Sequence, residues 1–281
     1  MADDNYRQNE LNHVWIVADY AEGDLAFKEV GARITSIDRS VVIHDVPVPA
    51  FKTVSAGFVI SQLALNFGGV GWQYIFANVA PRKDDPNHRL DNEGEKLVYV
   101  ELNSGTKIVA VNSGYTLSFI RDSIQKIFSV EVSNNGSQFR SRDYYPDAVC
   151  DVTSGRRKLI GREIDVDIPE PPKYTIAYVD NFGNIKTTVP LSSLEKDIAG
   201  LKRGDTLGVE IDGILKNAFY GKGIFDVREG GMIVAPGSSG RKNDKFVEIS
   251  IRGGSAIDAF EYQDRQRAFE TKVKISKRKI R

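Results

Sequence analysis

The chain has 281 residues, 41% of them hydrophobic, so it can bury the core of one large domain or of two ordinary ones. Its 38 basic and 38 acidic side chains balance, which argues against a general attraction to nucleic acid or to acidic membranes. The first residues are polar and lack an apolar signal core, and the longest apolar stretch, residues 57–65, is too short to span a bilayer. We therefore expect a soluble cytoplasmic protein with a small-molecule ligand.

Conventional metal and cofactor motifs are missing from the sequence. Three histidines and one cysteine make a zinc cluster improbable. There is no G-x-S-x-G elbow, P-loop or H-E-x-x-H sequence. We expect neither a metal nor a cofactor.

The first half of the chain alternates strand-like and helix-like runs. Its pattern predicts, in order, a strand (13–18), a helix (25–35), a strand (41–44), a helix (52–67), a strand (72–79), a hairpin (97–102 with 107–111) and a helix (115–128). Such alternation favours an α/β domain with a mostly parallel sheet over residues 1–162.

The amino-acid composition of the chain changes after residue 162. Residues 163–173 (EIDVDIPEPPK) are rich in proline and acid, which predicts a linker. Beyond the linker, residues 174–281 contain short strand-like runs at 174–179, 187–189, 206–211 and 246–251, separated by glycine and asparagine turns. This pattern predicts an all-β domain, a small barrel or a sandwich.

Two segments offer side chains for a nucleoside. Asp19 ends a buried strand, where ligands bind in open α/β sheets, and a carboxylate there can accept hydrogen bonds from a ribose diol. The alternative is a helix-capping or turn aspartate. Residues 178–184 (YVDNFGN) place Asp180, Phe182 and Asn184 in a glycine turn, where an aromatic face and an amide suit a purine. The alternative is a structural β-turn.

Two further glycine segments have weaker signals. Residues 237–240 (GSSG) predict a turn whose hydroxyls and backbone amides suit a carboxylate, or simply a loop. Residues 253–256 (GGSA) follow a strand and allow close backbone approach to a planar ring.

Taken together, these segments resemble the S-adenosylmethionine (SAM) hydrolases, also called SAM hydroxide adenosyltransferases, and the related fluorinases and chlorinases. Five segments carry the resemblance in the family's order: residues 18–24 for T-D-F-G…D, 111–114 for P-[DN]-N-G, 137–146 for S-x-T-F-x-[GS]-R-D-x-F-x-P, 180–184 for D-x-F-G-N, and 237–256 for the closing N-S-x-G…L-E-I-A…G-S-A pattern.

The resemblance implies an N-terminal α/β domain, a C-terminal β domain and a homotrimer whose pocket forms between one subunit's N-terminal domain and the next subunit's C-terminal domain. It implies that SAM is the substrate rather than a cofactor. The residues that it would place around SAM are Asp19 for the ribose hydroxyls, Phe51 near the sugar or methionine, Phe182 and Asn184 for adenine, Asp180 for the methionine amino group, and Ser238 or Ser239 for its carboxylate.

The departures from the family fall on the reacting centre. Residues 79–83 read V-A-P-R-K, so Ala80 replaces the hydrolase aspartate and the halogenase tyrosine. Arg140 stands where hydrolases have histidine, and Ser141 matches the fluorinase serine. The arginine of the hydrolase set corresponds to Arg82, to Arg89 or to neither.

Lys83 and Arg140 add positive charge. If they point inward, they repel a sulfonium and attract an anion. Otherwise they face solvent or pair with Asp84, Asp85 or Asp143. Arg140, Ser141 and Lys83 are therefore the catalytic candidates.

We expect an enzyme that displaces methionine from the ribose 5′ carbon of SAM with water, giving adenosine and methionine. A catalytically impaired SAM- or adenosine-binding protein is the alternative, as is an altered enzyme that uses halide or an anionic 5′-substituted adenosine.

Overall fold

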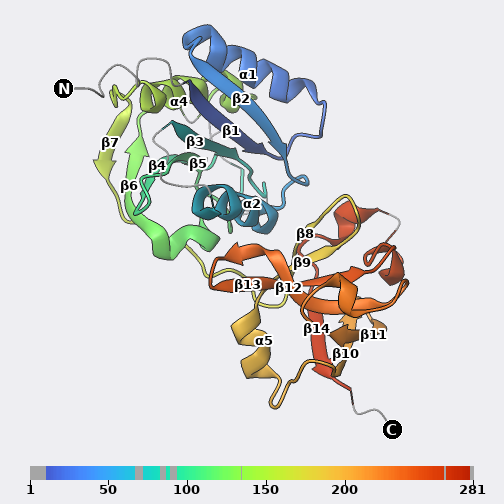
Figure 1. Ribbon diagram of the computed structural model, residues 1–281. Helices are drawn as coiled ribbons and strands as arrows, with labels where there is room; N and C mark the ends of the chain where they lie inside the picture. Colours follow the sequence, from blue (N-terminus) through green and yellow to red (C-terminus); the bar gives the residue numbers. More distant parts are fainter. Residues whose placement is uncertain are drawn as a thin grey trace, which may run out of the picture. The chain divides into compact units, whose positions relative to one another are not determined.

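The computed structural model describes residues 11–66, 72–82, 87–88, 94–133, 135–262 and 264–278. The chain divides into two compact units, Met1–Glu170 and Pro171–Arg281. We call them the N-terminal and C-terminal domains, and each has its own hydrophobic core (Figure 1).

The N-terminal domain is built on a seven-stranded mixed sheet in the order β2-β1-β3-β5-β4-β6-β7. The first four strands in that order are parallel, whereas β4, β6 and β7 are antiparallel to their neighbours. Its strands are β1 (Asn12–Ala18), β2 (Val41–Pro47), β3 (Gln73–Asn78), β4 (Leu97–Leu102), β5 (Lys107–Val111), β6 (Ile124–Val130) and β7 (Ile160–Glu163).

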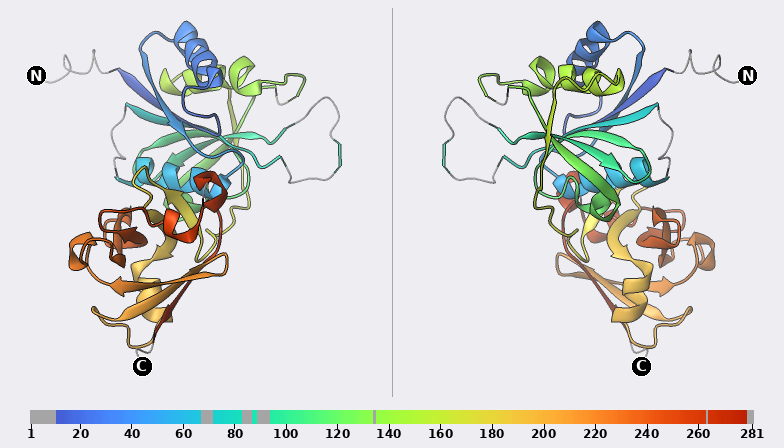
Figure 2. Two further views of the ribbon diagram at one scale, coloured as in Figure 1. Left: turned by 90° about the vertical axis from the view of Figure 1, so that its right-hand side faces the viewer. Right: turned by 90° about the vertical axis from the view of Figure 1, so that its left-hand side faces the viewer.

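Helices cover both faces of this sheet (Figures 1 and 2). On one face, α1 (Leu25–Ile37) and α4 (Tyr145–Thr153) contribute side chains to a core with β1 and β3, and the short α3 (Arg140–Asp143) precedes α4. On the other face, α2 (Thr53–Asn66) packs with its own set of sheet residues. Both sheet faces are therefore buried, as expected for a largely parallel sheet.

The order of the strands creates a switch point beside β1. The chain reaches β2 through α1 and β3 through α2, and β2 and β3 pair with opposite edges of β1. The carboxyl ends of β1 and β3 lie side by side, with Ala18 opposite Asn78. In open α/β sheets, this is where ligands bind.

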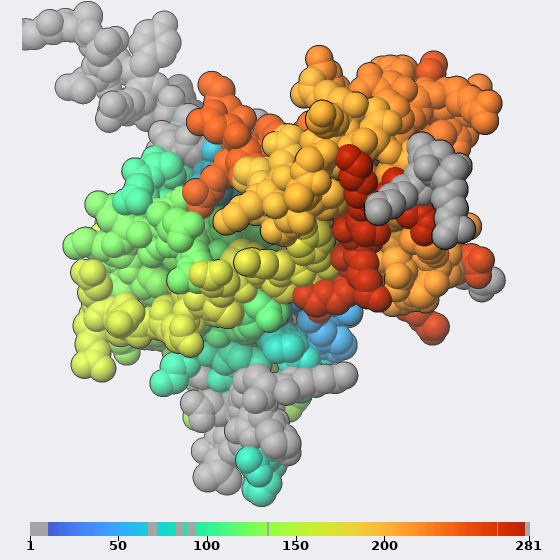
Figure 3. All heavy atoms as spheres, turned by 90° about the horizontal axis from the view of Figure 1, so that it is seen from below, coloured from blue at the N-terminus to red at the C-terminus, as the bar shows by residue number. Residues whose placement is uncertain are grey.

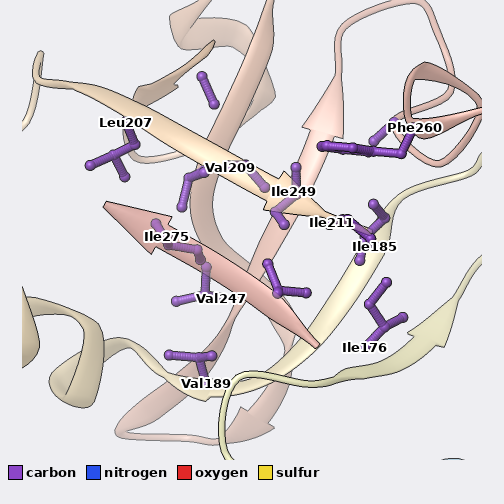
Figure 4. Packing of buried hydrophobic residues seen from close by; sticks show 14 of the residues in the cluster. Ile176, Ile185, Val189, Leu207, Val209, Ile211, Val247, Ile249, Phe260 and Ile275 are labelled. Carbon is purple, nitrogen blue, oxygen red and sulfur yellow. The ribbon is translucent and has the colours of Figure 1, made fainter. Parts of the chain in front are cut away.

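The C-terminal domain has a largely antiparallel, curled half-barrel sheet in the order β14-β10-β11-β12-β13-β9-β8, with one parallel pair, β11 and β12. Its strands are β8 (Ile176–Val179), β9 (Ile185–Pro190), β10 (Thr206–Ile211), β11 (Ile214–Tyr220), β12 (Met232–Arg241), β13 (Asp244–Ile251) and β14 (Val273–Lys277). The helix α5 (Leu191–Asp197) follows β9. Figure 4 shows the branched apolar side chains of several strands packed on one another, with Phe260 among them.

The two fold classes expected from the sequence are confirmed, with corrections of detail. The predicted helix over 115–128 is wrong: a 3-10 helix at Ser118–Ser123 leads into β6, which pairs with β4. The predicted turn at 237–240 is also wrong, because these residues lie inside β12, where the register shifts between Pro236 and Gly240.

The predicted strands miss β11 and β12, and in β12 Pro236, Gly237 and Gly240 weaken the strand pattern. The basic segment near the C-terminus forms β14, with Val273 and Ile275 buried and the lysines outward. Figure 3 shows these red residues on the surface beside orange residues of the same domain. Within the described residues, no helix is long and apolar enough to cross a membrane.

Candidate functional site

Asp19 follows β1 directly, at the switch point of the N-terminal sheet. Its Oδ2 accepts a hydrogen bond from the Phe51 backbone amide at 3.1 Å. Burial raises the pKa of the Asp19 carboxyl above its ordinary value, while the Phe51 amide and the positive charge of Arg82 oppose the rise. A carboxylate that is partly desolvated and lies at the carboxyl end of β1 suits a hydroxyl-bearing ligand.

Phe51 and Arg82 lie beside this carboxylate. Both have a left-handed backbone, with φ of 64° and 55°, which is uncommon for residues other than glycine. The Arg82 guanidinium carbon lies 5.2 Å from the centre of the Phe51 ring, within cation–π range. Phe51 is 44% exposed, so the ring remains available to a ligand.

A second group of polar side chains joins β1, β3 and α3. The Tyr20 hydroxyl lies 2.5 Å from Ser141 Oγ, and Asn78 Nδ2 donates to the Tyr20 hydroxyl at 2.9 Å. Burial is the main cause that raises the pKa of Tyr20 to about 12. Either hydroxyl can be the donor in the hydrogen bond between Tyr20 and Ser141. Ser141 is 5% exposed and is held firmly in this chain of bonds.

Arg140 does not pair with Asp143, one of its predicted carboxylate partners. Its Nη1 donates to the Ser137 carbonyl at 3.4 Å, it interacts with the Tyr145 hydroxyl, and its guanidinium lies against Gly94. Arg142, the neighbour of Ser141, pairs with Asp143 instead and lowers the pKa of that carboxyl.

Of the other predicted residues of the reacting centre, the structure describes only some. Ala80 is partly buried and packs against the core shared by α1 and α4. Lys83, the third catalytic candidate, lies outside the described residues, as do Arg89, Asp84 and Asp85.

In the C-terminal domain, residues 180–184 form a tight turn between β8 and β9. Asp180 Oδ1 accepts from the backbone amides of Phe182 and Asn184, both at 3.0 Å, and Oδ2 accepts from Asn184 Nδ2 at 3.1 Å. Gly183 has φ of +81°, and a Cβ there would clash with the Ser255 side chain. The turn therefore requires glycine, and it brings residues 253–256 against residues 180–184.

This turn presents two groups that a purine could use. Phe182 is 76% exposed, an unusual position for a large aromatic ring. Asn184 Oδ1 is buried and has no hydrogen-bond partner among the described residues. Because a buried acceptor without a donor is destabilising, this atom is a candidate acceptor for a ligand N–H group.

Lys186, which the sequence did not single out, lies at the centre of a charged group next to the turn. Its Nζ contacts Glu248 Oε2 at 2.7 Å, Ser238 Oγ at 3.2 Å and Asp180 Oδ2 at 3.7 Å. Lys186 and Glu248 face each other across the β9–β13 pair. We call Asp180, Lys186, Ser238 and Glu248 the lysine cluster.

The two serines predicted to hold a carboxylate point to different surroundings. Ser238 is exposed and joins the lysine cluster, and its carbonyl lies 3.5 Å from Lys245 Nζ. Ser239 is 6% exposed. Among the described residues, no group of three or more histidine, cysteine, aspartate or glutamate side chains could hold a metal ion.

Three residues of the candidate site were not predicted from the sequence, and they differ in whether the sequence contains a signal for them. Tyr20 occupies the phenylalanine position of the T-D-F-G pattern, so its extra hydroxyl was a readable signal. Asn78 is the next-to-last residue of the strand predicted over 72–79. Lys186 has no local signal, because its partner Glu248 is 62 positions away.

The C-terminal domain is similar to a known family of proteins. Residues 174–268 match the family model described as the SAM hydroxide adenosyltransferase C-terminal domain. None of the curated proteins gives a significant match.

Two solved structures share the fold. One is an uncharacterized conserved protein from Thermotoga maritima, with a TM-score of 0.74 and 19% identity, covering 93% of this chain and 99% of that one. The other is a conserved hypothetical protein from Thermus thermophilus, with a TM-score of 0.63 and 19% identity, covering 94% of this chain and 100% of that one.

The matched segment contains the Asp180–Asn184 turn, the lysine cluster and residues 253–256. The C-terminal domain of the chain is thus similar to the C-terminal domain of the SAM hydroxide adenosyltransferases.

Proposed function

We propose that the chain binds an adenosyl nucleoside and cleaves it at the ribose 5′ carbon. The observation that carries this proposal is the turn at residues 180–184 inside the matched domain. There the exposed Phe182 ring stands next to Asn184, whose buried Oδ1 lacks a donor among the described residues. A purine would stack on the ring and donate its exocyclic N–H to the amide oxygen.

The N-terminal domain supplies groups for the sugar and the reacting atoms. Asp19 would accept from the ribose hydroxyls, and Phe51 would pack against the sugar. Ser141, which is hydrogen-bonded to Tyr20, would form a hydrogen bond with the attacking oxygen. These assignments are supported by the position of Asp19 and Ser141 near the carboxyl ends of β1 and β3.

In its simplest form the reaction is SAM hydrolysis. A water oxygen forms a bond to the 5′ carbon, the carbon–sulfur bond breaks, and its electron pair leaves with sulfur as neutral methionine. The water loses a proton to solvent, and adenosine is formed. Such displacement depends more on placement and desolvation of the nucleophile than on a strong general base, whose loss costs about a hundredfold to ten-thousandfold.

Incubation with SAM, followed by chromatography for adenosine and methionine, tests the reaction. We expect both products in equal amounts above the protein-free rate, and a large reduction in Asp19→Asn. A rate equal to that of the protein-free control at millimolar SAM would reject hydrolysis.

Nucleoside binding without turnover is the second candidate, because Ala80 and Arg140 replace the family's aspartate and histidine. Calorimetry with adenosine distinguishes it. Saturable binding without product formation supports a binding protein, and absence of binding rejects both candidates.

We further propose that the protein assembles as a homotrimer, as the family resemblance implies, and uses a small-molecule substrate without nucleic acid or membrane partners. Light scattering should then give three times the chain mass of 31.2 kDa. A monomer mass at micromolar concentration would contradict this assembly.

A further inference from the structure

The lysine cluster already contains an ammonium group, and this bears on which adenosyl ligands the C-terminal domain accepts. Lys186 is largely buried, with a side chain 13% exposed, between Asp180 and Glu248, which are 21% and 17% exposed. Its ammonium lies 2.7 Å from Glu248 Oε2, 3.2 Å from Ser238 Oγ and 3.7 Å from Asp180 Oδ2. An ammonium has three donors, and this one has three oxygens around it.

Asp180 is fully engaged by the protein. A carboxylate offers about four lone-pair sites. Two on Asp180 accept the backbone amides of Phe182 and Asn184, and Oδ2 accepts Asn184 Nδ2 and faces the Lys186 ammonium. Three of the four sites are thus occupied by hydrogen bonds, and the Lys186 ammonium lies next to the carboxylate where a second cation would have to bind.

Glu248 is engaged in the same way. Its Oε2 accepts from Lys186, and its Oε1 accepts from the Ser250 hydroxyl at 3.2 Å. The side chain is also confined, because a Cβ at Gly237 would lie 2.8 Å from Glu248 Oε2. Glu248 therefore cannot turn toward a ligand without leaving Lys186.

The surroundings of Ser238 add positive charge. Lys186 approaches its hydroxyl, and Lys245 lies 3.5 Å from its carbonyl. The ammonium groups of Lys186 and Lys245 both contact Ser238, and together they disfavour a third cation nearby. Like charges in a partly desolvated site repel strongly.

We infer that Lys186 is a specificity-determining residue, and that the site takes an adenosyl ligand whose 5′ substituent carries no ammonium group, such as an uncharged thioether. The Lys186 side chain occupies the position that a ligand's α-ammonium would need in order to reach Asp180. This inference rests on the proposed adenosyl binding. SAM, whose methionine carries an α-ammonium, then binds less tightly than such a thioether, but it can still be cleaved at the millimolar concentration of the hydrolysis assay.

Two probes differ by the amino-acid tail that carries this ammonium group. S-adenosylhomocysteine and 5′-methylthioadenosine both have an uncharged sulfur on the 5′ carbon, but only the first has an amino-acid tail. Isothermal calorimetry on the full-length protein should show 5′-methylthioadenosine binding at least about tenfold more tightly, because a lost or opposed charge-assisted contact is worth that much.

Lys186→Met leaves Asp180 and Glu248 available for a ligand cation. We expect S-adenosylhomocysteine to gain about tenfold in affinity in this variant, while 5′-methylthioadenosine changes less than about twofold. Lys186→Arg keeps the cation and should behave as the wild type. Lys274→Met is the matched control, because it removes a lysine of the same domain from an exposed ion pair with Glu210.

Each outcome separates the inference from the proposed function. S-adenosylhomocysteine binding as tightly as 5′-methylthioadenosine to the wild type overturns the inference and leaves adenosyl binding intact. Equal shifts of both ligands in Lys186→Met also overturn it, because they indicate a general structural effect. If neither these ligands nor adenosine binds, the proposed function fails, and the inference fails with it.

Discussion

Two carboxylates, Asp180 in the C-terminal domain and Asp19 in the N-terminal domain, have opposite surroundings. Asp180 belongs to the turn at 180–184 and the lysine cluster, and Asp19 lies beside Tyr20. Asp180 is saturated by three hydrogen bonds and a lysine, so it mainly holds the turn in shape. Asp19 accepts one strong hydrogen bond and has a pKa raised by burial. The first carboxylate stabilises structure, and the second carries a desolvation cost that a ligand can offset.

The two regions also differ in how far they follow the family. The turn at 180–184 keeps the D-x-F-G-N pattern and lies within the matched domain. In the N-terminal region, Ala80 and Arg140 depart from the pattern, and Tyr20 adds a hydroxyl that binds Ser141. This contrast teaches that the residues proposed to bind the purine keep the family pattern, whereas those proposed to surround the reacting atoms depart from it.

Substituting Asp180 with alanine should have the largest effect on stability. It removes three hydrogen bonds and one of the two carboxylates next to Lys186, and we expect a loss of about 3 kcal/mol in unfolding free energy. Circular dichroism should show the loss. Fluorescence is a less direct probe, because both tryptophans, Trp15 and Trp72, lie in the N-terminal domain.

The control is Asp258→Ala, which breaks an exposed 3.7 Å ion pair with Arg265 and should cost less than about 1 kcal/mol. Equal losses in the two variants would show that Asp180 does not hold the turn, and the contrast with Asp19 would disappear.

Asp19→Asn should weaken ligand binding rather than folding. We expect adenosine affinity to fall about tenfold to a hundredfold, because the ribose diol loses a charged acceptor. Stability should stay unchanged or rise, since the buried charge is removed. Calorimetry and tryptophan-monitored urea unfolding measure the two effects.

Asp45→Asn serves as the control, because Asp45 pairs with Lys28 on the surface of the same domain. A large stability loss in Asp19→Asn with unchanged adenosine affinity would make Asp19 a structural residue like Asp180.

Tyr20→Phe restores the ring that the family pattern has at this position and removes the hydroxyl between Asn78 and Ser141. We expect a loss of about 1 kcal/mol in the unfolding free energy of the N-terminal domain. A double-mutant cycle with Ser141→Ala should give a coupling energy of similar size. Additive effects of the two substitutions would mean that the hydroxyls do not form a hydrogen bond.

The smallest effect concerns His13 and His44, at the opposite end of the N-terminal sheet. Their Nδ1 and Nε2 atoms are 2.8 Å apart, and burial, followed by the charge of His13, lowers the pKa of His44. The unfolded chain therefore binds more protons, and stability falls as pH drops below the ordinary histidine value of about 6.5.

Urea unfolding followed by tryptophan fluorescence at pH 7.5 and 5.5 should show a loss of less than about 1 kcal/mol, which His44→Gln should reduce. An increase in stability of the wild type over the same change would contradict the lowered pKa.

The sequence predicts a helix or hairpin of this fold well where the element depends on one buried face or on one turn. The β4–β5 hairpin has the predicted bounds, and α2 differs from its prediction by one residue at each end. The segment 115–128 was misread because its apolar spacing suits a helix, whereas pairing of β6 with β4 and β7 makes its second part a strand. Long-range strand pairing overrides local periodicity.

The candidate site shows the same limit. The Asp180–Asn184 turn was predictable because its five residues are contiguous and one is a glycine with positive φ. The place of Lys186 was not, because it depends on the register between β9 and β13 and on the irregularity in β12. Ser238, which contacts Lys186, lies within the part of β12 where the register shifts.

A crystal structure of the protein with adenosine bound tests the central claim most directly. We predict the purine ring on the face of Phe182, with its exocyclic amine within hydrogen-bond distance of Asn184 Oδ1. A purine bound elsewhere, with the turn at 180–184 unoccupied, would contradict the account.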